Sequence, residues 1–217
     1  MLSLIDRIES IAADPRGTVT FANGDDTVTI GWDDLHRDAR AAAAGLQARG
    51  VRPGDHVALI GPTTQRLITT IQATWLTGAA LVTMPLPMRM AALDQFIAQT
   101  RARIHRSNTR IVVIDADLAA FIEPAPGDPP FVTLDELFAD GEPGEDSYRR
   151  PDSDPDSLAV LQFTSGSTSE PKGCEMGPTD HLRSPEPKIK HWLAILQNLR
   201  PWGPCVVYGW ESTIGGS

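Results

Sequence analysis

Short apolar runs alternate with longer segments through the middle of the chain. The short runs, His56–Ile60, Ala80–Met84 and Arg110–Ile114, have the composition of buried strands. The longer segments, Thr64–Thr77 and Ala91–Arg106, have the length and pattern of helices. Short apolar strands that alternate with helices favour βαβ units. We therefore predict an α/β fold in which helices cover both faces of a parallel sheet.

The first fifty residues predict a hairpin followed by a helix. Residues 19–30 contain two short strand-like runs around the turn-forming pair Asn23-Gly24. The next segment carries apolar side chains on one helical face and runs to about Ala48. Because aspartate is a favoured residue at the start of a helix, we expect Asp33 or Asp34 to cap it.

The region after the last of these strands is predicted to be rich in loops. Within residues 123–157, Phe131–Thr133 has the composition of a short strand and Leu134–Phe138 that of a helical turn. Residues 141–156 are acidic and rich in proline, so we expect them to lie on the surface. A new apolar strand is predicted at Leu158–Phe163.

Composition excludes several classes of function. The chain has 217 residues and a net charge of −9, which argues against a nucleic-acid binder and a polybasic membrane-surface protein. With only two cysteines, we expect no disulfide framework. No secretory signal and no run of about 18 apolar residues is present. These features predict a cytoplasmic protein without a membrane span.

The distribution of basic residues divides the chain into two parts. The sequence has 16 arginines and three lysines, and the first lysine is Lys172. Both cysteines and three of the five tryptophans fall after Gly173, where acids and bases balance. We therefore expect residues 1–173 and 174–217 to be different units.

The segment Thr164–Gly173, directly after the last predicted strand, has the composition of a phosphate-binding loop. It combines hydroxyl side chains with two glycines and Lys172. Glycines let backbone N–H groups converge on an anion, and lysine adds a mobile positive charge. The pattern is not the common P-loop, because Lys172 precedes Gly173 and follows a proline. The alternative interpretation is a solvated linker, which has no need of a buried strand or of this lysine.

The same segment resembles the phosphate-binding signature of adenylate-forming enzymes, which include acyl-CoA synthetases, fatty acyl-AMP ligases and nonribosomal adenylation domains. Leu161–Phe163 ahead of it and Ser169 within it resemble the fatty acyl-AMP ligase branch in particular. Upstream segments also resemble the opening of these enzymes: Trp32–Leu35, Gly50–Leu59, Ala73–Ala79 and Pro85–Pro87.

This resemblance implies a function and a set of site residues. In the family the loop holds the β- and γ-phosphates of ATP while a carboxylate attacks the α-phosphate, with Mg²⁺ present, to give an acyl-adenylate and pyrophosphate. The substrate implied is a fatty or related carboxylic acid, and the acceptor, coenzyme A or a carrier protein, stays open. Lys172 would be the catalytic cation. The residues that would bind the nucleotide are Thr164, Ser165, Gly166, Ser167, Thr168, Lys172 and Gly173.

Other family elements have no match in the sequence. Family members continue with an adenine-binding strand, a Thr-Glu pair that helps hold Mg²⁺, a ribose-binding aspartate and a C-terminal catalytic lysine, and none of these can be placed in Glu175–Ser217. We therefore expect a truncated or frameshifted product with no activity alone and a mobile tail from about residue 175. The alternatives are an acyl-CoA ligase fragment and a non-catalytic remnant that binds phosphate weakly.

No metal site is predicted. The cysteines have no metal-binding spacing, and the histidines are dispersed. A basic patch lies near the end of one predicted helix. We expect its charges to interact favourably with the negative end of the helix dipole or to be solvated, and an anion site is the alternative. Its members are Arg101, Arg103, Arg106 and Arg110.

Overall fold

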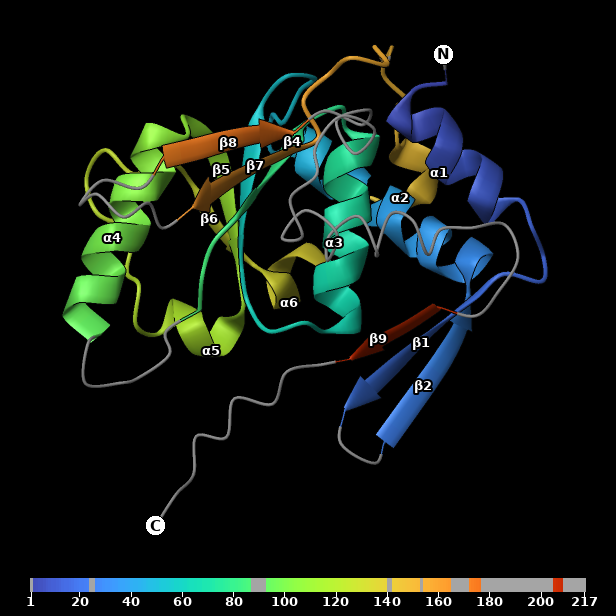
Figure 1. The fold of residues 1–217 in the computed structure, drawn as a ribbon, viewed down its shortest axis with the longest axis horizontal. Coiled ribbons are helices and arrows are strands. Elements are labelled where there is room, and N and C mark those ends of the chain that lie inside the picture. The colour runs from blue at the N-terminus through green and yellow to red at the C-terminus, as the bar shows by residue number, and fades with distance from the viewer. Residues whose placement is uncertain are drawn as a thin grey trace.

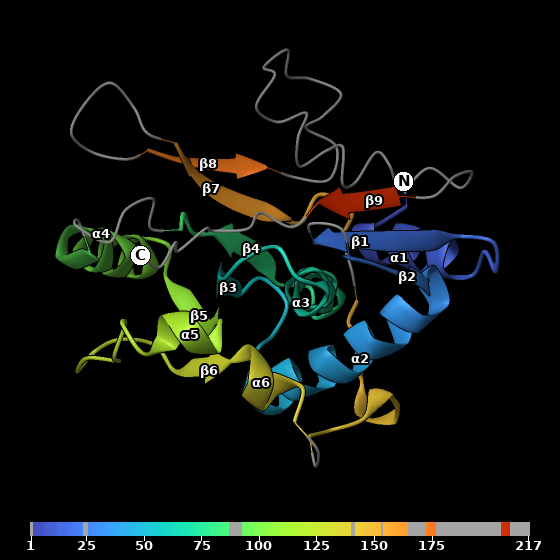
Figure 2. The ribbon, with the colours of Figure 1, turned by 90° about the horizontal axis from the view of Figure 1, so that it is seen from below.

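A computed structural model gives the fold of this chain (Figure 1). The residues it describes are 2–23, 26–86, 93–139, 142–152, 154–164, 172–176 and 205–208. Within these ranges a large sheet lies between two groups of helices, and a smaller sheet lies beside it (Figures 1 and 2).

The main sheet has six strands among the described residues, in the order β6-β5-β3-β4-β7-β8. Five of them run parallel, and β8 alone is antiparallel to its neighbour β7. This confirms the predicted α/β fold with a parallel sheet. The strands are β3 (His56–Ile60), β4 (Ala80–Thr83), β5 (Thr109–Ile114), β6 (Phe131–Thr133), β7 (Val160–Thr164) and β8 (Lys172–Met176).

Helices cover both faces of this sheet, as predicted. Figure 2 shows α4 (Leu93–Arg106) and α5 (Ala116–Ala119) on one side, and α2 (Trp32–Ala48) and α3 (Gln65–Leu76) on the other. The side chains of each strand alternate between the two faces: Val57 and Leu59 join the core under α2 and α3, whereas Ala58 and Ile60 join the core under α4. In the described part of the chain, no helix has the length and apolar character needed to cross a membrane.

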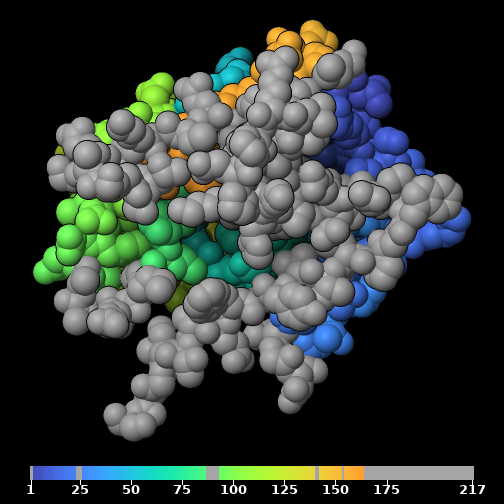
Figure 3. All heavy atoms as spheres, viewed as in Figure 1, coloured from blue at the N-terminus to red at the C-terminus, as the bar shows by residue number. Residues whose placement is uncertain are grey.

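A small sheet contains the predicted hairpin. Strand β1 (Thr18–Asn23) pairs antiparallel with β2 (Asp26–Gly31) and parallel with β9 (Cys205–Tyr208). Asn23, which the sequence placed in the turn, instead pairs with Asp26 and is the last residue of β1. In Figure 3 the hairpin side of the molecule, in blue, and α4, in green, lie at opposite ends of the same face.

Most predicted boundaries agree with the structure to within two residues. Helix α3 begins after Thr64, whose hydroxyl accepts a hydrogen bond from the Leu67 N–H, and Gly78 ends the turn that follows it with a φ of +77°. The prediction missed five of the described elements: α1 (Leu4–Ala12), α5, the short 3₁₀ turn η2 (Glu145–Ser147) and the strands β8 and β9. Helix α1 begins with a capping box between Ser3 and Asp6, a local signal that the sequence analysis did not use.

The predicted cap of α2 is wrong. Gly31 occupies the cap position and makes no side-chain hydrogen bond, and the helix begins at Trp32. Asp33 and Asp34 therefore lie inside the first turn, where the positive end of the helix dipole attracts their negative charges and stabilises the helix. Strand β2 ends directly at the helix, so no free residue remains for an aspartate cap.

The segment 141–156 is not wholly on the surface. Tyr148 is 8% exposed and packs in the core, and its hydroxyl donates a 2.9 Å hydrogen bond to the carbonyl of Leu76 at the end of α3. The segment therefore lies against the helical layer as a connector between α6 (Leu134–Leu137) and β7.

The described parts of the tail form strands. The sequence predicted a mobile tail from about residue 175, which stays a prediction. Among the described residues, Glu175 and Met176 pair with β7 and Cys205–Tyr208 pairs with β1. The helix considered between Pro187 and Pro201 lies outside the described residues.

Candidate functional site

The carboxyl ends of the parallel strands meet at one edge of the main sheet. Thr164 is the last residue of β7, which lies between β4 and β8. Residues that follow neighbouring parallel strands come together at this edge, where α/β sheets bind their ligands. The structure therefore places the start of the predicted phosphate-binding segment where a ligand site is expected.

The strands β7 and β8 form an antiparallel pair that closes this segment. Thr164 is the Cα partner of Lys172, and Phe163 is the partner of Gly173. Residues opposite each other in such a pair have Cα atoms about 4.5–5.5 Å apart. Three of the predicted site residues, Thr164, Lys172 and Gly173, are thus brought together by backbone pairing.

The remaining predicted site residues lie between these partners in sequence and outside the described residues. They are Ser165, Gly166, Ser167 and Thr168. Strand β8 itself was missed by the sequence analysis and continues past Gly173 to Met176, opposite Val160.

Strand β7 is held by both cores of the protein. Val160 is 5% exposed and belongs to the core under α2 and α3, whereas Leu161 is 8% exposed and belongs to the core under α4. Phe163 packs against the same core as Leu161. Strand β7 is therefore held from both faces of the sheet, at its start by Val160 and further along by Leu161 and Phe163.

The same edge contains a second cation, which sequence analysis did not single out. Arg66, in the first turn of α3, forms an ion pair with Asp135, in the first turn of α6, and lies 5.8 Å from the centre of the Phe138 ring. Its charge is thus already paired. The loops are tightly packed here, because a Cβ atom at Gly61 would lie 3.2 Å from the Cβ of Asp115.

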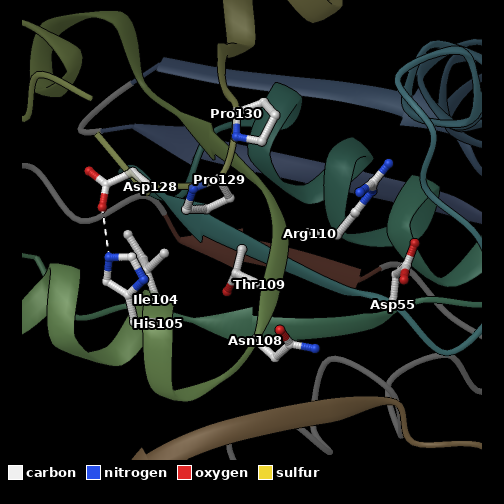
Figure 4. A pocket seen from close by; sticks show the side chains of 10 residues that line it. Asp55, Ile104, His105, Asn108, Thr109, Arg110, Asp128, Pro129 and Pro130 are labelled. Carbon is white, nitrogen blue, oxygen red and sulfur yellow. Dashed lines mark hydrogen bonds and ion pairs between the residues drawn. The ribbon is translucent and has the colours of Figure 1, made fainter. Parts of the chain in front are cut away.

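A groove of about 410 Å³ lies at the opposite, amino edge of the sheet, between the end of α4 and residues 127–130 (Figure 4). Asp128 is its best-buried charged group, with a side chain that is 1% exposed. Its carboxylate accepts hydrogen bonds from Arg101 Nε at 3.0 Å, His105 Nε2 at 2.8 Å and the Ala125 N–H at 2.9 Å.

These contacts give one member of the basic patch, Arg101, a partner that neither sequence interpretation named. Arg101 is an ion-pair partner of Asp128 rather than a solvated charge or an anion ligand. Burial favours a higher pKa for Asp128, but the hydrogen bonds from Ala125, Arg101 and His105 outweigh it and hold the pKa below its usual value. Arg101 and His105 therefore fasten the loop 123–130 to α4, whereas Arg103 and Arg106 lie in the last turn of α4, where the helix-dipole interpretation places them.

The donor set at the carboxyl edge fits a phosphate group. Lysine, hydroxyl and glycine residues supply N–H and O–H donors, which phosphate oxygens accept. A magnesium ion instead prefers oxygen ligands such as carboxylates. Within the part of the chain that the structure describes, no three His, Cys, Asp or Glu side chains are grouped to hold a metal, and we assign no magnesium ligand.

Comparisons with known proteins point to one family. Residues 9–181 match the model of the AMP-binding enzyme family. The chain is 30% identical over 149 residues to the fatty acid–[acyl-carrier-protein] ligase ScoC of Streptomyces coeruleorubidus, covering 67% of this chain and 27% of that protein. It is 34% identical over 143 residues to a feruloyl-CoA synthase of Amycolatopsis sp, covering 65% of this chain and 27% of that protein.

A solved structure shows the same fold. The fatty acyl-adenylate ligase from L. pneumophila, in complex with acyl adenylate and pyrophosphate, superimposes with a TM-score of 0.70 at 29% identity. The superposition covers 83% of this chain and 31% of that one. The chain thus spans about a third or less of the length of these relatives. Because the family match covers most of its residues, the chain belongs to the AMP-binding enzyme family.

Proposed function

We propose that this chain is the phosphate-binding portion of a fatty acyl-AMP ligase, which activates a fatty or related carboxylic acid as its adenylate with ATP. The observation that carries the proposal is the pairing of Thr164 with Lys172 at the carboxyl edge of the parallel sheet. The likeness to a fatty acid–[acyl-carrier-protein] ligase and to a fatty acyl-adenylate ligase supports the fatty acid branch.

The proposed roles follow from the chemistry of the segment. Bound ATP would supply the adenylyl group and the leaving pyrophosphate. Lys172 would offset the negative charge on the pyrophosphate, and an interaction of this kind lowers the barrier when it strengthens as the charge develops. Hydroxyl and backbone donors would bind the phosphate oxygens, and the glycines would let the backbone approach them. The proposed nucleotide-binding residues are Thr164, Ser165, Gly166, Ser167, Thr168, Lys172 and Gly173.

We further propose that residues 1–173 form the family portion and that residues 174–217 contribute little to the chemistry. The two cysteines favour a reducing, cytoplasmic setting. An acyl-CoA ligase is the second candidate, because the feruloyl-CoA synthase is also similar over this region. The acyl acceptor would be a carrier protein in the first case and coenzyme A in the second.

Titration with pyrophosphate tests the phosphate-binding assignment. We expect pyrophosphate to shift the amide signals of residues 165–173. The dissociation constant should be roughly millimolar, which corresponds to a binding free energy of about −4 kcal/mol. Lys172→Ala should remove much of the shift, because charge-assisted bonds contribute about 1.5–3 kcal/mol each. Arg66→Ala is the matched control: it removes a cation from the same edge, but one already paired with Asp135.

Two outcomes would contradict the assignment. A clear titration that Lys172→Ala leaves unchanged would exclude Lys172 as the phosphate ligand. If the unmodified chain shows no shift at high millimolar pyrophosphate, the segment does not bind phosphate in this chain and the assignment fails.

Turnover is the second test. We expect no ATP–pyrophosphate exchange above background from the 217-residue chain with any member of a fatty acid panel. The chain spans 27% of the length of its fatty acid ligase relative, and catalysis needs groups that position the acid and the α-phosphate together. Exchange above background would show that these residues suffice for adenylation and would overturn the proposal that the chain is inactive alone.

A further inference from the structure

The residue before β7 is held by two hydrogen bonds to one carbonyl. The indole N–H of Trp75, in the last turn of α3, donates to the carbonyl of Ala159 at 2.9 Å. The backbone N–H of Leu81, in β4, donates to the same oxygen at 3.0 Å. Both residues are buried, with Trp75 7% and Ala159 4% exposed. The carbonyl is therefore fixed by the helix layer and by the sheet together.

This carbonyl is where β7 could lose its register. Strand β7 joins the parallel sheet through β4 alone, with the pairs Leu81↔Val160, Val82↔Leu161 and Thr83↔Gln162. Its other neighbour, β8, follows it directly along the chain through the phosphate-binding segment, so β8 would move together with β7. A slip of two residues keeps each side chain on its own face but moves the strand by about 6.6–6.8 Å. Such a slip would carry Thr164 and Lys172 away from the sheet edge.

We infer that Trp75 is a positioning residue for the phosphate-binding segment. Its N–H fixes Ala159, Ala159 sets the register of β7 on β4, and β7 ends at Thr164. The inference rests on the proposed function, since it assigns Trp75 a role in phosphate binding without contact with the phosphate. The helix end that carries Trp75 is itself braced, because the Thr77 hydroxyl donates to the Thr74 carbonyl and the Gly54 N–H donates to the Gly78 carbonyl.

A matched pair of variants separates positioning from stability. Trp75→Phe removes the donor to Ala159 and keeps an aromatic ring. Tyr148→Phe removes a buried hydrogen bond of the same 2.9 Å length to the Leu76 carbonyl, at the same end of α3, but without a link to β7. Both variants should lower the urea midpoint. Site-specific benzothienylalanine at position 75, in which sulfur replaces the N–H, keeps the packing if Trp75→Phe does not fold.

Phosphate binding should distinguish the two. If the binding-competent register falls to about a fifth of the population, the apparent dissociation constant for pyrophosphate rises about fivefold. We expect a rise of about three- to tenfold for Trp75→Phe and none for Tyr148→Phe. The register is read independently from cross-strand NOEs between β4 and β7, which should weaken or double only when the donor at position 75 is lost.

The outcomes are separable. Unchanged pyrophosphate affinity and unchanged β4–β7 NOEs in a folded variant without the donor would reduce Trp75 to a packing residue. If the unmodified chain binds no pyrophosphate, the proposed function fails. The NOEs then decide the positioning role by themselves: register heterogeneity confined to the position 75 variants supports it, and a single register overturns it.

Discussion

Single buried polar groups tie distant parts of this chain together. The Tyr148 hydroxyl and the Trp75 indole each meet a carbonyl that lies more than 70 positions away in sequence. A buried donor without a partner costs about 1–3 kcal/mol, so each contact specifies one arrangement of the chain. At this scale the connector before β7 and the start of β7 are both fastened to the end of α3.

Tyr148 should make the protein sensitive to alkali. Burial raises the pKa of its hydroxyl to about 12, above the unfolded value of about 10. A raised pKa means that the folded state keeps the proton longer, so stability is intact below pH 10 and falls as pH rises from about 10 to 12. We expect the urea midpoint of the unmodified chain to fall over this window.

Tyr148→Phe provides the comparison for this effect. The variant should start from a lower midpoint but lose less of it between pH 10 and pH 12, because it has no phenol to ionise at this position. An equally steep loss in both proteins would show that other groups cause the alkaline sensitivity.

Elements with a local signal were predictable from sequence. Strands β3 and β5 and helix α3 combine an apolar pattern with a turn or cap at each end, and their limits follow from residues such as Thr64 and Gly78. The position of the phosphate-binding segment after a strand was predictable for the same reason. Its single lysine among many arginines marked it further.

Elements that depend on distant partners were not predictable. Strand β8 contains Gly173 and Glu175, which have low strand propensity, and it forms because β7 offers a free edge. Tyr148 lies in a proline-rich acidic segment, and its burial depends on the end of α3. Likewise, the indole of Trp75 has no sequence signal for its bond to Ala159, because the spacing of 84 residues carries no periodicity.

The whole molecule is organised so that ion pairs hold its connectors against its helices. Arg150 bonds to Asp6 at 2.5 Å and to Glu9 at 2.9 Å on α1, and Arg49, the C-cap residue of α2, bonds to Glu142 at 2.6 Å. Pairs that water reaches, such as those of Arg150, are individually weak. They nevertheless span chain separations of 93 to 144 residues, so their loss affects the arrangement of the layers rather than one helix.

Acid should therefore destabilise the chain well before all carboxylates are neutral. Backbone and side-chain hydrogen bonds from Ser3 lower the pKa of Asp6, and the hydrogen bond from Arg49 lowers the pKa of Glu142. Burial favours a higher pKa for Asp128, but its hydrogen bonds outweigh burial and lower that pKa as well. Each folded pKa lies below its unfolded value, so the stabilisation is present above about pH 4 and is lost as pH falls through the folded values.

Burial of His36 extends this loss to milder acid. It lowers the pKa of that imidazole, so the unfolded state takes up a proton first as pH falls below about 6.5, and stability declines. We expect the urea midpoint to fall steadily from pH 7 to pH 3.

Asp128→Asn should have a lower urea midpoint at pH 7, and its midpoint should fall less between pH 7 and pH 3, because the most buried of these carboxylates is removed. Asp152→Asn, at an exposed connector residue, is the control and should keep the slope of the unmodified chain. If the urea midpoint of Asp128→Asn falls as steeply with decreasing pH as that of the unmodified chain, the Arg101–Asp128–His105 contact adds nothing to acid stability.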